Sequence, residues 1–209
     1  MKDSHVLVLA KAPEAGRSKT RLCPPYAPDQ AAEVAEAALA DTLEAVAASG
    51  ARRRILALDG PPGPWLPPGF DVVAQVSGSF ATRLQAAWDH AGGPGVQIGM
   101  DTPQVTASML DHALGLLDDH EALLGLAEDG GWWALGLRQA QPGLFDGVPM
   151  STARTGFDQY IRLRALGLAV RMLPTMRDLD TASDAATIAA SAPGTRTSRI
   201  VRAMLPRAA

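Results

Sequence analysis

Short apolar runs recur along the chain, and each ends in a polar or glycine-containing segment. Such runs occupy residues 6–10, 54–58, 96–100 and 122–127. Runs of this length are typical of strands buried on both faces, as parallel strands are. Segments with helical spacing of apolar residues lie between them. The alternation predicts an α/β fold in which a mostly parallel central sheet is flanked by helices on both faces.

The remaining elements follow from periodicity and from capping residues. Asp29 and Gly50 are suited to begin and end the first of the predicted helices, which span residues 29–48, 81–91, 106–117, 152–166 and 181–190. Further strands are predicted at residues 70–76, 132–137 and 168–173. A tight turn at residues 128–131 predicts a small antiparallel excursion. The polar, basic residues from about 193 to 209 predict a loosely held tail.

Length and charge narrow the class of protein. No linker-like stretch divides the 209 residues, so a single domain over residues 1–209 is expected. A formal net charge of −3 gives nucleic acid no overall field to follow, so no nucleic-acid partner is expected. The first apolar run stops at Lys11, too short for a signal sequence or a membrane span. These features predict a cytoplasmic protein, and they leave its oligomeric state open.

The number and spacing of the cysteines and histidines argue against a disulfide and against metal sites that use these residues as ligands. The single cysteine, Cys23, excludes an intramolecular disulfide and a cysteine-based zinc cluster. The four histidines lack the paired spacing of histidine-ligated metal sites. Any metal site is therefore expected to use oxygen ligands.

Ligands of parallel sheets bind at the carboxyl ends of the strands. Three polar clusters directly follow predicted strands, at residues 11–21, 101–103 and 128–131. The candidate functional residues are therefore expected there.

The first cluster is basic. It contains Gly16 and four cations, Lys11, Arg17, Lys19 and Arg21, which together suit a phosphate group. Ser18 replaces the glycine that precedes lysine in a Walker A loop, and no G-x-G-x-x-G follows the first strand. P-loop NTPase and Rossmann dehydrogenase functions therefore lose support. The alternative is a solvated basic loop.

The second cluster offers a metal-binding carboxylate. Asp101 follows a predicted strand and precedes Pro103, a placement suited to Mg²⁺ or Mn²⁺. One aspartate rarely suffices for such an ion, and residues 177–181 supply a second carboxylate in Asp178 or Asp180. The alternatives are that Asp101 or Thr102 only caps the helix that follows this cluster, and that Asp180 only caps the last predicted helix.

The third cluster combines acidic residues, glycines and tryptophans. Gly130 and Gly131 allow close approach of a ligand to the backbone, and Glu128 and Asp129 suit sugar hydroxyls, a base or a metal. Trp132 and Trp133 are expected to point to opposite faces of a strand, so that one of them lines a pocket. The alternatives are a plain hairpin turn and core packing of the tryptophans.

Five motifs in this order resemble the bacterial DUF2064 family. They are KAPEAGRSKTRL at residues 11–22, GMDTP at 99–103, AEDGGWW at 127–133, LFDGVPMST at 144–152 and RDLDT at 177–181. Members of this family are described as glycosyltransferases, often linked to radical-SAM gene neighbourhoods, with the GT-A (Rossmann-like) fold of nucleotide-diphospho-sugar transferases. The layout is also similar to molybdenum-cofactor and phospholactate guanylyltransferases. Residues 75–84 depart from the family pattern, and Trp132-Trp133 replace commoner tyrosines.

The resemblance implies that each cluster binds a different part of the substrates or the metal ion. It places a nucleotide on residues 11–21, with Lys11, Gly16, Arg17, Lys19 and Arg21 as the binding residues. It places Mg²⁺ or Mn²⁺ on Asp101 and Asp180, with Asp178 as an alternative second ligand. The acceptor would lie near Glu128, Asp129, Gly130, Gly131 and Trp132.

Together, the residues and the resemblance predict a metal-dependent transferase with a nucleotide-activated donor. Its catalytic residues are Asp101, Lys19 and Asp129, and its leading reaction is glycosyl transfer from a nucleotide sugar to a small-molecule acceptor. A close alternative is nucleotidyl transfer from an NTP with release of pyrophosphate, because four cations in one loop suit a triphosphate. A further alternative is a nucleotide-binding protein without catalysis.

Overall fold

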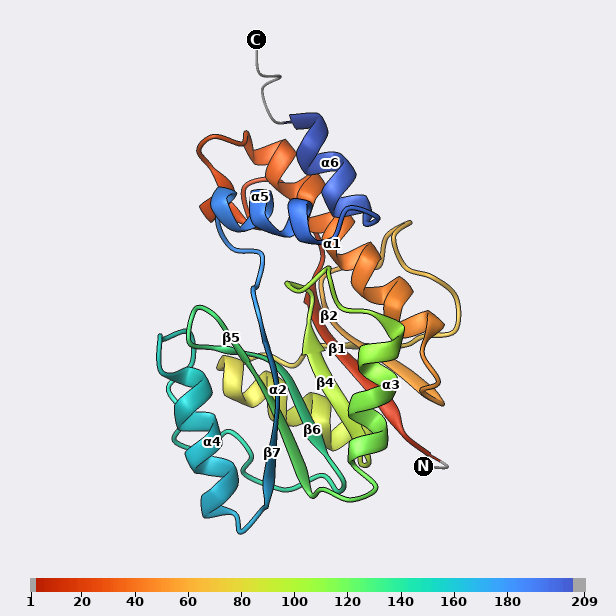
Figure 1. Ribbon diagram of the computed structural model, residues 1–209, viewed down its shortest axis with the longest axis vertical. Coiled ribbons are helices and arrows are strands. Elements are labelled where there is room, and N and C mark those ends of the chain that lie inside the picture. Colours follow the sequence, from red (N-terminus) through yellow and green to blue (C-terminus); the bar gives the residue numbers. More distant parts are fainter. Residues whose placement is uncertain (1–2, 205–209) are drawn as a thin grey trace.

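The computed structural model describes residues 3–204, which form a central sheet between layers of helices (Figure 1). The strands are β1 (His5–Lys11), β2 (Arg53–Asp59), β3 (Asp71–Ala74), β4 (Gly95–Gly99), β5 (Ala122–Ala127), β6 (Trp132–Leu137) and β7 (Val170–Met176). The helices are η1 (Thr20–Leu22), α1 (Pro28–Ala48), α2 (Phe80–Ala91), α3 (Ala107–Leu116), α4 (Thr155–Ala165), α5 (Ala182–Ser191) and α6 (Arg196–Met204).

The seven strands have the order β3-β2-β1-β4-β6-β5-β7. Every neighbouring pair is parallel except those that involve β6, which is antiparallel to both β4 and β5. The predicted α/β fold, with a mostly parallel sheet and a small antiparallel excursion, is confirmed.

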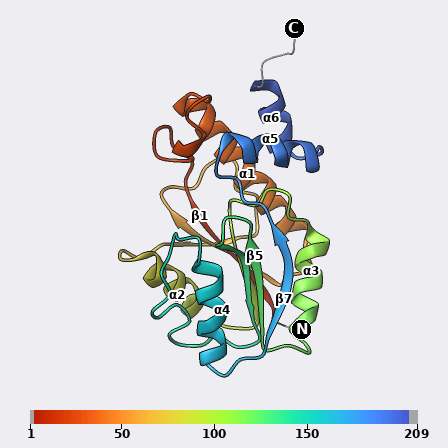
Figure 2. The same cartoon turned by 60° about the vertical axis from the view of Figure 1, so that its left-hand side comes forward.

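Helices cover both faces of the sheet, which explains the apolar runs. Helices α1 and α3 pack on one face, and α2 and α4 pack on the other (Figure 2). Residues 5–10 of the central strand β1 are all buried because both faces of this strand are covered.

A third apolar cluster lies beyond the carboxyl ends of the strands. It joins η1, the first half of α1, α5 and α6, and its buried members include Leu22, Val34, Leu179, Ile188 and Val201. Figures 1 and 2 both show these helices stacked at the end of the sheet where β1 and β4 finish. This helical end therefore faces the edge of the sheet at which ligands are expected.

The predicted loose tail is wrong for residues 196–204, which form helix α6. Val201 has no exposed surface, and the carboxylate of Asp41 in α1 accepts hydrogen bonds from the backbone of Arg196 and Thr197. The sequence of this segment is short and arginine-rich, and it does not by itself indicate a helix, because the groups that hold the helix in place come from a distant segment. Residues 205–209 of the predicted tail lie outside the described residues.

Two other boundaries differ by three residues. The helix predicted from residue 152 begins at Thr155, because residues 152–154 form a turn, and the strand predicted at residues 168–173 runs from Val170 to Met176. None of the helices within residues 3–204 combines the length and apolarity needed to cross a membrane.

Buried His5 makes the stability of the fold depend on pH. Its ring is fully buried, lies edge-on to Trp88 at 5.4 Å between centroids, and has no hydrogen-bond partner for either nitrogen within residues 3–204. Burial, together with the positive charge of Arg53, lowers the pKa of His5 from 6.5 to about 4. The neutral ring is therefore the form that fits the core.

We expect His5→Phe to remove part of the acid sensitivity. Because the unfolded chain binds this proton more tightly, the contribution of His5 to stability is present above pH 6.5 and is lost as the pH falls towards 4. The free energy of unfolding of the variant, relative to the natural chain, should rise by roughly 3 kcal/mol between pH 7 and pH 4. Urea denaturation at both pH values measures this, and His112→Phe on the exposed side of α3 is the control. Equal pH dependence in the natural chain and in His5→Phe would contradict the assignment.

Candidate functional site

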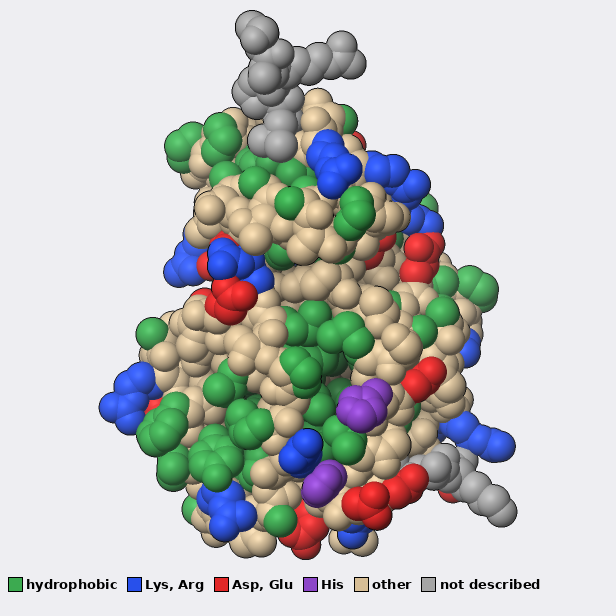
Figure 3. All heavy atoms as spheres, in the orientation of Figure 1, with side chains coloured by type: hydrophobic (Ala, Val, Ile, Leu, Met, Phe, Trp, Pro, Cys, Tyr) green, Lys and Arg blue, Asp and Glu red, His purple; other side chains and the backbone are tan. Residues whose placement is uncertain are grey.

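The candidate site lies where the ends of β1, β4 and β7 meet the helical end of the molecule. Lys11 ends β1, Asp101 follows β4, and Asp178 follows β7. Basic and acidic side chains gather at the left margin of the molecule, at the level where the helical end meets the sheet (Figure 3). Three adjoining pockets occupy this region.

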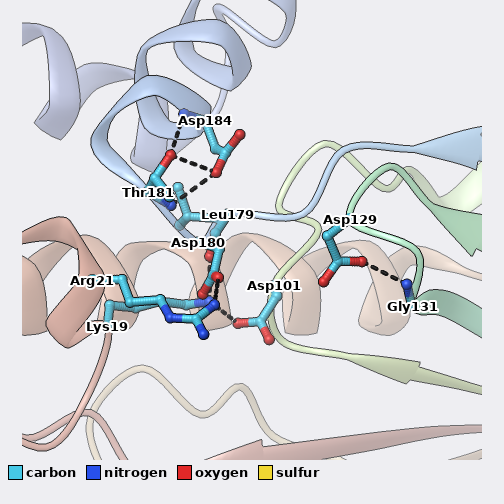
Figure 4. Close-up of polar contacts among 9 residues, drawn as sticks. All are labelled: Lys19, Arg21, Asp101, Asp129, Gly131, Leu179, Asp180, Thr181 and Asp184. Carbon is cyan, nitrogen blue, oxygen red and sulfur yellow. Dashed lines mark hydrogen bonds and ion pairs between the residues drawn. The ribbon is translucent and has the colours of Figure 1, made fainter. Parts of the chain in front are cut away.

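Lys19 and Arg21 connect the basic loop to two other segments (Figure 4). The Nζ atom of Lys19 lies 2.5 Å from Oδ1 of Asp101 and donates a hydrogen bond to the carbonyl oxygen of Leu179. Arg21 lies 2.5 Å from Oδ2 of Asp180. The backbone N–H of buried Leu179 donates to the carbonyl oxygen of Asp101 at 2.7 Å. The first and fifth of the motifs, residues 11–22 and 177–181, therefore converge on Asp101.

The basic pocket is a cavity of about 300 Å³ at this junction. It is lined by Lys11, Arg17, Ser18, Lys19, Thr20, Arg21, Met100, Asp101 and Asp180. The four cations of the basic loop outnumber the two carboxylates of this lining, so an anion is the ligand with complementary charge. Arg17 pairs with Glu14 at 2.6 Å, with both side chains more than half exposed. Gly16 has a φ of 74° and serves the turn of the loop.

The acidic pocket adjoins the basic pocket and has a volume of about 100 Å³. Asp101, Asp129 and Asp178 all line it. Partial burial, together with the negative charges of Asp129 and Asp101, raises the pKa of Asp178 to about 6. The hydroxyl of Thr102 in the same lining is buried and has no hydrogen-bond partner within residues 3–204.

This acidic pocket bears on the two alternatives for a second metal ligand. Asp178 lies in the electrostatic cluster with Asp101, whereas Asp180 turns to Arg21. Among residues 3–204, no three acidic, histidine or cysteine side chains converge closely enough to hold a metal ion by themselves. Any ion bound here would take further ligands from water or from a phosphate group.

The acidic turn between β5 and β6 places Asp129 but not Glu128 in the pockets. Asp129 lines both the acidic pocket and the deep pocket described below, and its Oδ1 accepts the N–H of Gly131 at 2.7 Å. Glu128 instead pairs with Arg177 at 2.5 Å. Of the two predicted acidic substrate residues, only Asp129 is therefore presented to a ligand.

Gly130 fixes this turn, and Gly130→Ala is expected to be severely destabilising. Its φ is +91°, and a β-carbon would lie 2.0 Å from the carbonyl oxygen of Ala153. The backbone must shift to relieve that overlap, and we expect a loss of at least about 3 kcal/mol in the free energy of unfolding. Gly147→Ala is the control, since Gly147 also has a positive φ of 73° but open space around it. It should cost only about 1 kcal/mol, and equal losses in urea denaturation would contradict the steric argument.

The deep pocket has a volume of about 420 Å³ and opens beside Asp101. Trp132 forms part of its wall and stacks on Phe145 at 6.3 Å between centroids. Trp133 is buried and donates from Nε1 to the carbonyl oxygen of Pro174 at 2.9 Å. Of the two tryptophans, Trp132 alone therefore lines the deep pocket, whereas both contribute to the lining of the acidic pocket.

Several residues of the deep pocket were not predicted from the sequence. Gln75 donates to the carbonyl oxygens of Ala10 and Ala57 and accepts from Arg83 at 3.0 Å, which ties the ends of β1 and β2 to α2. Gln97 lies inside β4 and also lines the pocket. The only signals in the sequence are the departure of residues 75–84 from the family pattern and one polar residue within an apolar strand.

Solved structures with this architecture define its class. A proposed nucleotide-diphospho-sugar transferase from Desulfovibrio desulfuricans G20 is 26% identical to the chain, with a TM-score of 0.87, and the alignment covers 96% of this chain and 94% of that one. The chain therefore has the nucleotide-diphospho-sugar transferase fold. It belongs to the DUF2064 family, described as uncharacterized proteins conserved in bacteria, whose sequence model matches residues 26–152.

Two more distant structures share the fold alone. A cytidylyltransferase from Leptospira borgpetersenii serovar Hardjo-bovis is 13% identical with a TM-score of 0.60, over 97% of this chain and 93% of that one. A CMP:2-keto-3-deoxy-manno-octonic acid synthetase, solved with CTP, is 13% identical with a TM-score of 0.57, over 91% of this chain and 99% of that one. No functionally curated protein matches the sequence.

Proposed function

We propose that this protein is a metal-dependent transferase that uses a nucleotide-activated donor, and that glycosyl transfer from a nucleotide sugar is its leading reaction. The observation that carries the proposal is the position of Asp101 between two pockets of opposite charge. The basic pocket suits phosphate groups, and the acidic pocket suits a cation. A diphosphate with its counter-ion has this charge distribution.

The cationic residues would bind the phosphates of the donor. Lys19 is held by Asp101 and by the carbonyl oxygen of Leu179, so its ammonium group is already positioned. Lys11 lines both the basic and the deep pocket. Positioned cations of this kind stabilise the negative charge that develops on a departing phosphate. Arg21 would add to this field from the rim, and Arg17 would contribute least because it is exposed and paired.

The donor set of the acidic pocket fits Mg²⁺ or Mn²⁺. Both ions prefer oxygen ligands, and the pocket offers the carboxylates of Asp101 and Asp178 with the unpartnered hydroxyl of Thr102 nearby. The pKa of Asp178 is raised first by burial and then by the negative charges of Asp129 and Asp101, and a cation would offset those charges. When bound, the ion would neutralise the phosphate oxygens of the leaving group. Asp180, the other candidate ligand, would first have to leave Arg21.

Asp129 is the residue best placed to bind an acceptor. It lines the acidic and deep pockets together, and Figure 4 shows its carboxylate directed towards Asp101. The N–H of Gly131 holds one carboxylate oxygen, which leaves the other to accept a proton or a hydrogen bond from an acceptor hydroxyl.

Nucleotidyl transfer from an NTP is the second candidate. The excess of cations in the basic pocket favours it, because a triphosphate carries more charge than a diphosphate. The fold shared with a synthetase solved with CTP is compatible with it.

Ligand-induced thermal stabilisation tests the proposal and separates the candidates. A ligand that binds only the folded chain raises its unfolding temperature by mass action. We expect nucleotide sugars to stabilise the chain in Mn²⁺ or Mg²⁺ but not in EDTA. Stabilisation by NTPs alone would favour nucleotidyl transfer, and metal-independent binding without turnover would favour a non-catalytic nucleotide-binding protein. No stabilisation by any nucleotide would refute all three.

A further inference from the structure

Gln97 is a polar side chain at a position where the fold calls for an apolar one. In β4 it lies between Leu7 of β1 and Leu135 of β6, both fully buried. The side chain of Gln97 is only 1% exposed, and its Oε1 has no hydrogen-bond partner within residues 3–204. Burying an amide without a partner is unfavourable, so leucine would serve a purely structural role better.

The amide of Gln97 faces a space that a ligand can enter. Gln97 lines the deep pocket. Gly99 lies two residues further on the same side of β4, and a β-carbon there would meet no atom closer than 3.9 Å. The absence of a side chain at Gly99 therefore keeps open the space between Gln97 and Asp101. An inserted ligand could give the amide the partner that it lacks.

The pocket is arranged so that a group attached to the phosphates would reach Gln97. Lys11, Met100 and Asp101 line both the deep pocket and the basic pocket, so the two pockets adjoin. A phosphate held by Lys19 and Lys11 would direct its substituent past Asp101 into the deep pocket. There the wall includes Trp132, held by stacking on Phe145, and the hydroxyl-bearing residues Ser151 and Thr152.

We propose that Gln97 is a specificity-determining residue that binds the sugar ring of the substrate through two neighbouring hydroxyl groups. This inference rests on the proposed function, whose sugar-binding subsite it names. A carboxamide presents a donor and an acceptor side by side, which matches one hydroxyl that accepts and one that donates. An aromatic wall beside such an amide suits the apolar face of a sugar ring. The sugar belongs either to the nucleotide donor or to the acceptor.

Isothermal titration of the full chain and of Gln97→Leu tests the inference. The first probes are four nucleotide sugars, UDP-glucose, UDP-N-acetylglucosamine, GDP-mannose and ADP-glucose, and the matching nucleoside diphosphates, all titrated in Mn²⁺. The other probes are the free sugars glucose, mannose and N-acetylglucosamine. If the sugar is that of the donor, Gln97→Leu should weaken nucleotide-sugar binding at least tenfold and leave diphosphate binding unchanged. If the sugar is that of the acceptor, the variant should lose binding of a free sugar by the same factor.

Gln159→Leu is a matched control. Gln159 is also fully buried with an unpartnered Oε1, but its Nε2 donates to the carbonyl oxygen of Leu144, and it does not line the deep pocket. Gln159→Leu should lower the unfolding temperature and leave sugar binding unchanged. Gln97→Leu should keep or raise the unfolding temperature, because it removes an unpartnered buried amide.

The outcomes separate this inference from the proposed function. If Gln97→Leu loses sugar-dependent binding and Gln159→Leu keeps it, the inference is supported. If free sugars bind in this way but nucleotides do not bind, the inference still holds and only the proposed function fails. Equal weakening of diphosphates and nucleotide sugars would show that Gln97 contacts the nucleoside and would overturn the inference. Sugar binding unchanged by Gln97→Leu, or no binding of any sugar in either form, would also overturn it.

Discussion

Replacing Asp101 with alanine should lower transferase activity about a thousandfold and abolish the effect of metal ions on nucleotide binding. Asp101 lines the basic, acidic and deep pockets, and it is the carboxylate that pairs with Lys19. Its removal takes a ligand from the proposed metal site and frees the ammonium group of Lys19. Nucleotide affinity in EDTA should therefore stay the same or increase, while Mn²⁺ should no longer strengthen binding.

The measurement compares nucleotide binding and turnover with and without Mn²⁺, using a donor found by thermal stabilisation. Asp180→Ala is the matched variant, since Asp180 lines the basic pocket and pairs with Arg21. If Asp178 is the second metal ligand, Asp180→Ala should retain the effect of Mn²⁺, and Asp178→Asn should lose it. Loss in Asp180→Ala with retention in Asp178→Asn would support the ligand pair Asp101 and Asp180. Full activity of Asp101→Ala would contradict the metal site altogether.

Replacing Asp41 with alanine should destabilise the chain by roughly 3 kcal/mol. Asp41 is 9% exposed, and its carboxylate accepts three hydrogen bonds from the start of α6. They come from the backbone N–H groups of Arg196 and Thr197 at 2.9 and 2.8 Å and from the Thr197 hydroxyl at 2.7 Å. Thr197 is fully buried, so alanine at position 41 would leave buried donors without partners.

Urea denaturation with Thr106→Ala as the control measures this effect. Thr106 caps α3 from within its own chain segment and accepts from the N–H of Met109 at 3.3 Å near the surface. Losing such a cap costs about 1 kcal/mol. Because Asp41 caps a helix far away in the sequence, its loss should be clearly larger. Similar losses in both variants would indicate that α6 contributes little to stability.

The fold could be predicted from the sequence because its strands are buried on both faces. An apolar run such as residues 6–10 indicates a central strand without knowledge of its neighbours. The rule that ligands bind at the carboxyl ends of strands then locates Lys11, Asp101 and Asp178 correctly at one edge. Short polar motifs that directly follow a strand can be recognised from the local sequence. In the structure these motifs lie together at one edge of the sheet.

Features that depend on distant segments could not be predicted. Asp178 and Asp180 are two residues apart, and their different surroundings follow from the burial of Leu179 between them and its hydrogen bond to Asp101. Helix α6 depends on Asp41, which is 155 residues away from Arg196. Gln97 has no signal beyond its polarity, since the pocket above it exists only once Gly99, Trp132 and helix α2 are in place.

Strand β6 joins two parts of the sheet that are synthesised at different times. Strands β3, β2, β1 and β4 come from residues 5–99, whereas β5, β6 and β7 come from residues 122–176, and only the β4–β6 pairing connects the two sets. On the ribosome, the first set can therefore assemble with one edge of β4 still unpaired. Such an edge attracts other strands. We expect a nascent chain stalled before β6 to be prone to aggregation and unable to bind nucleotide with metal, because Asp178 has not yet been added.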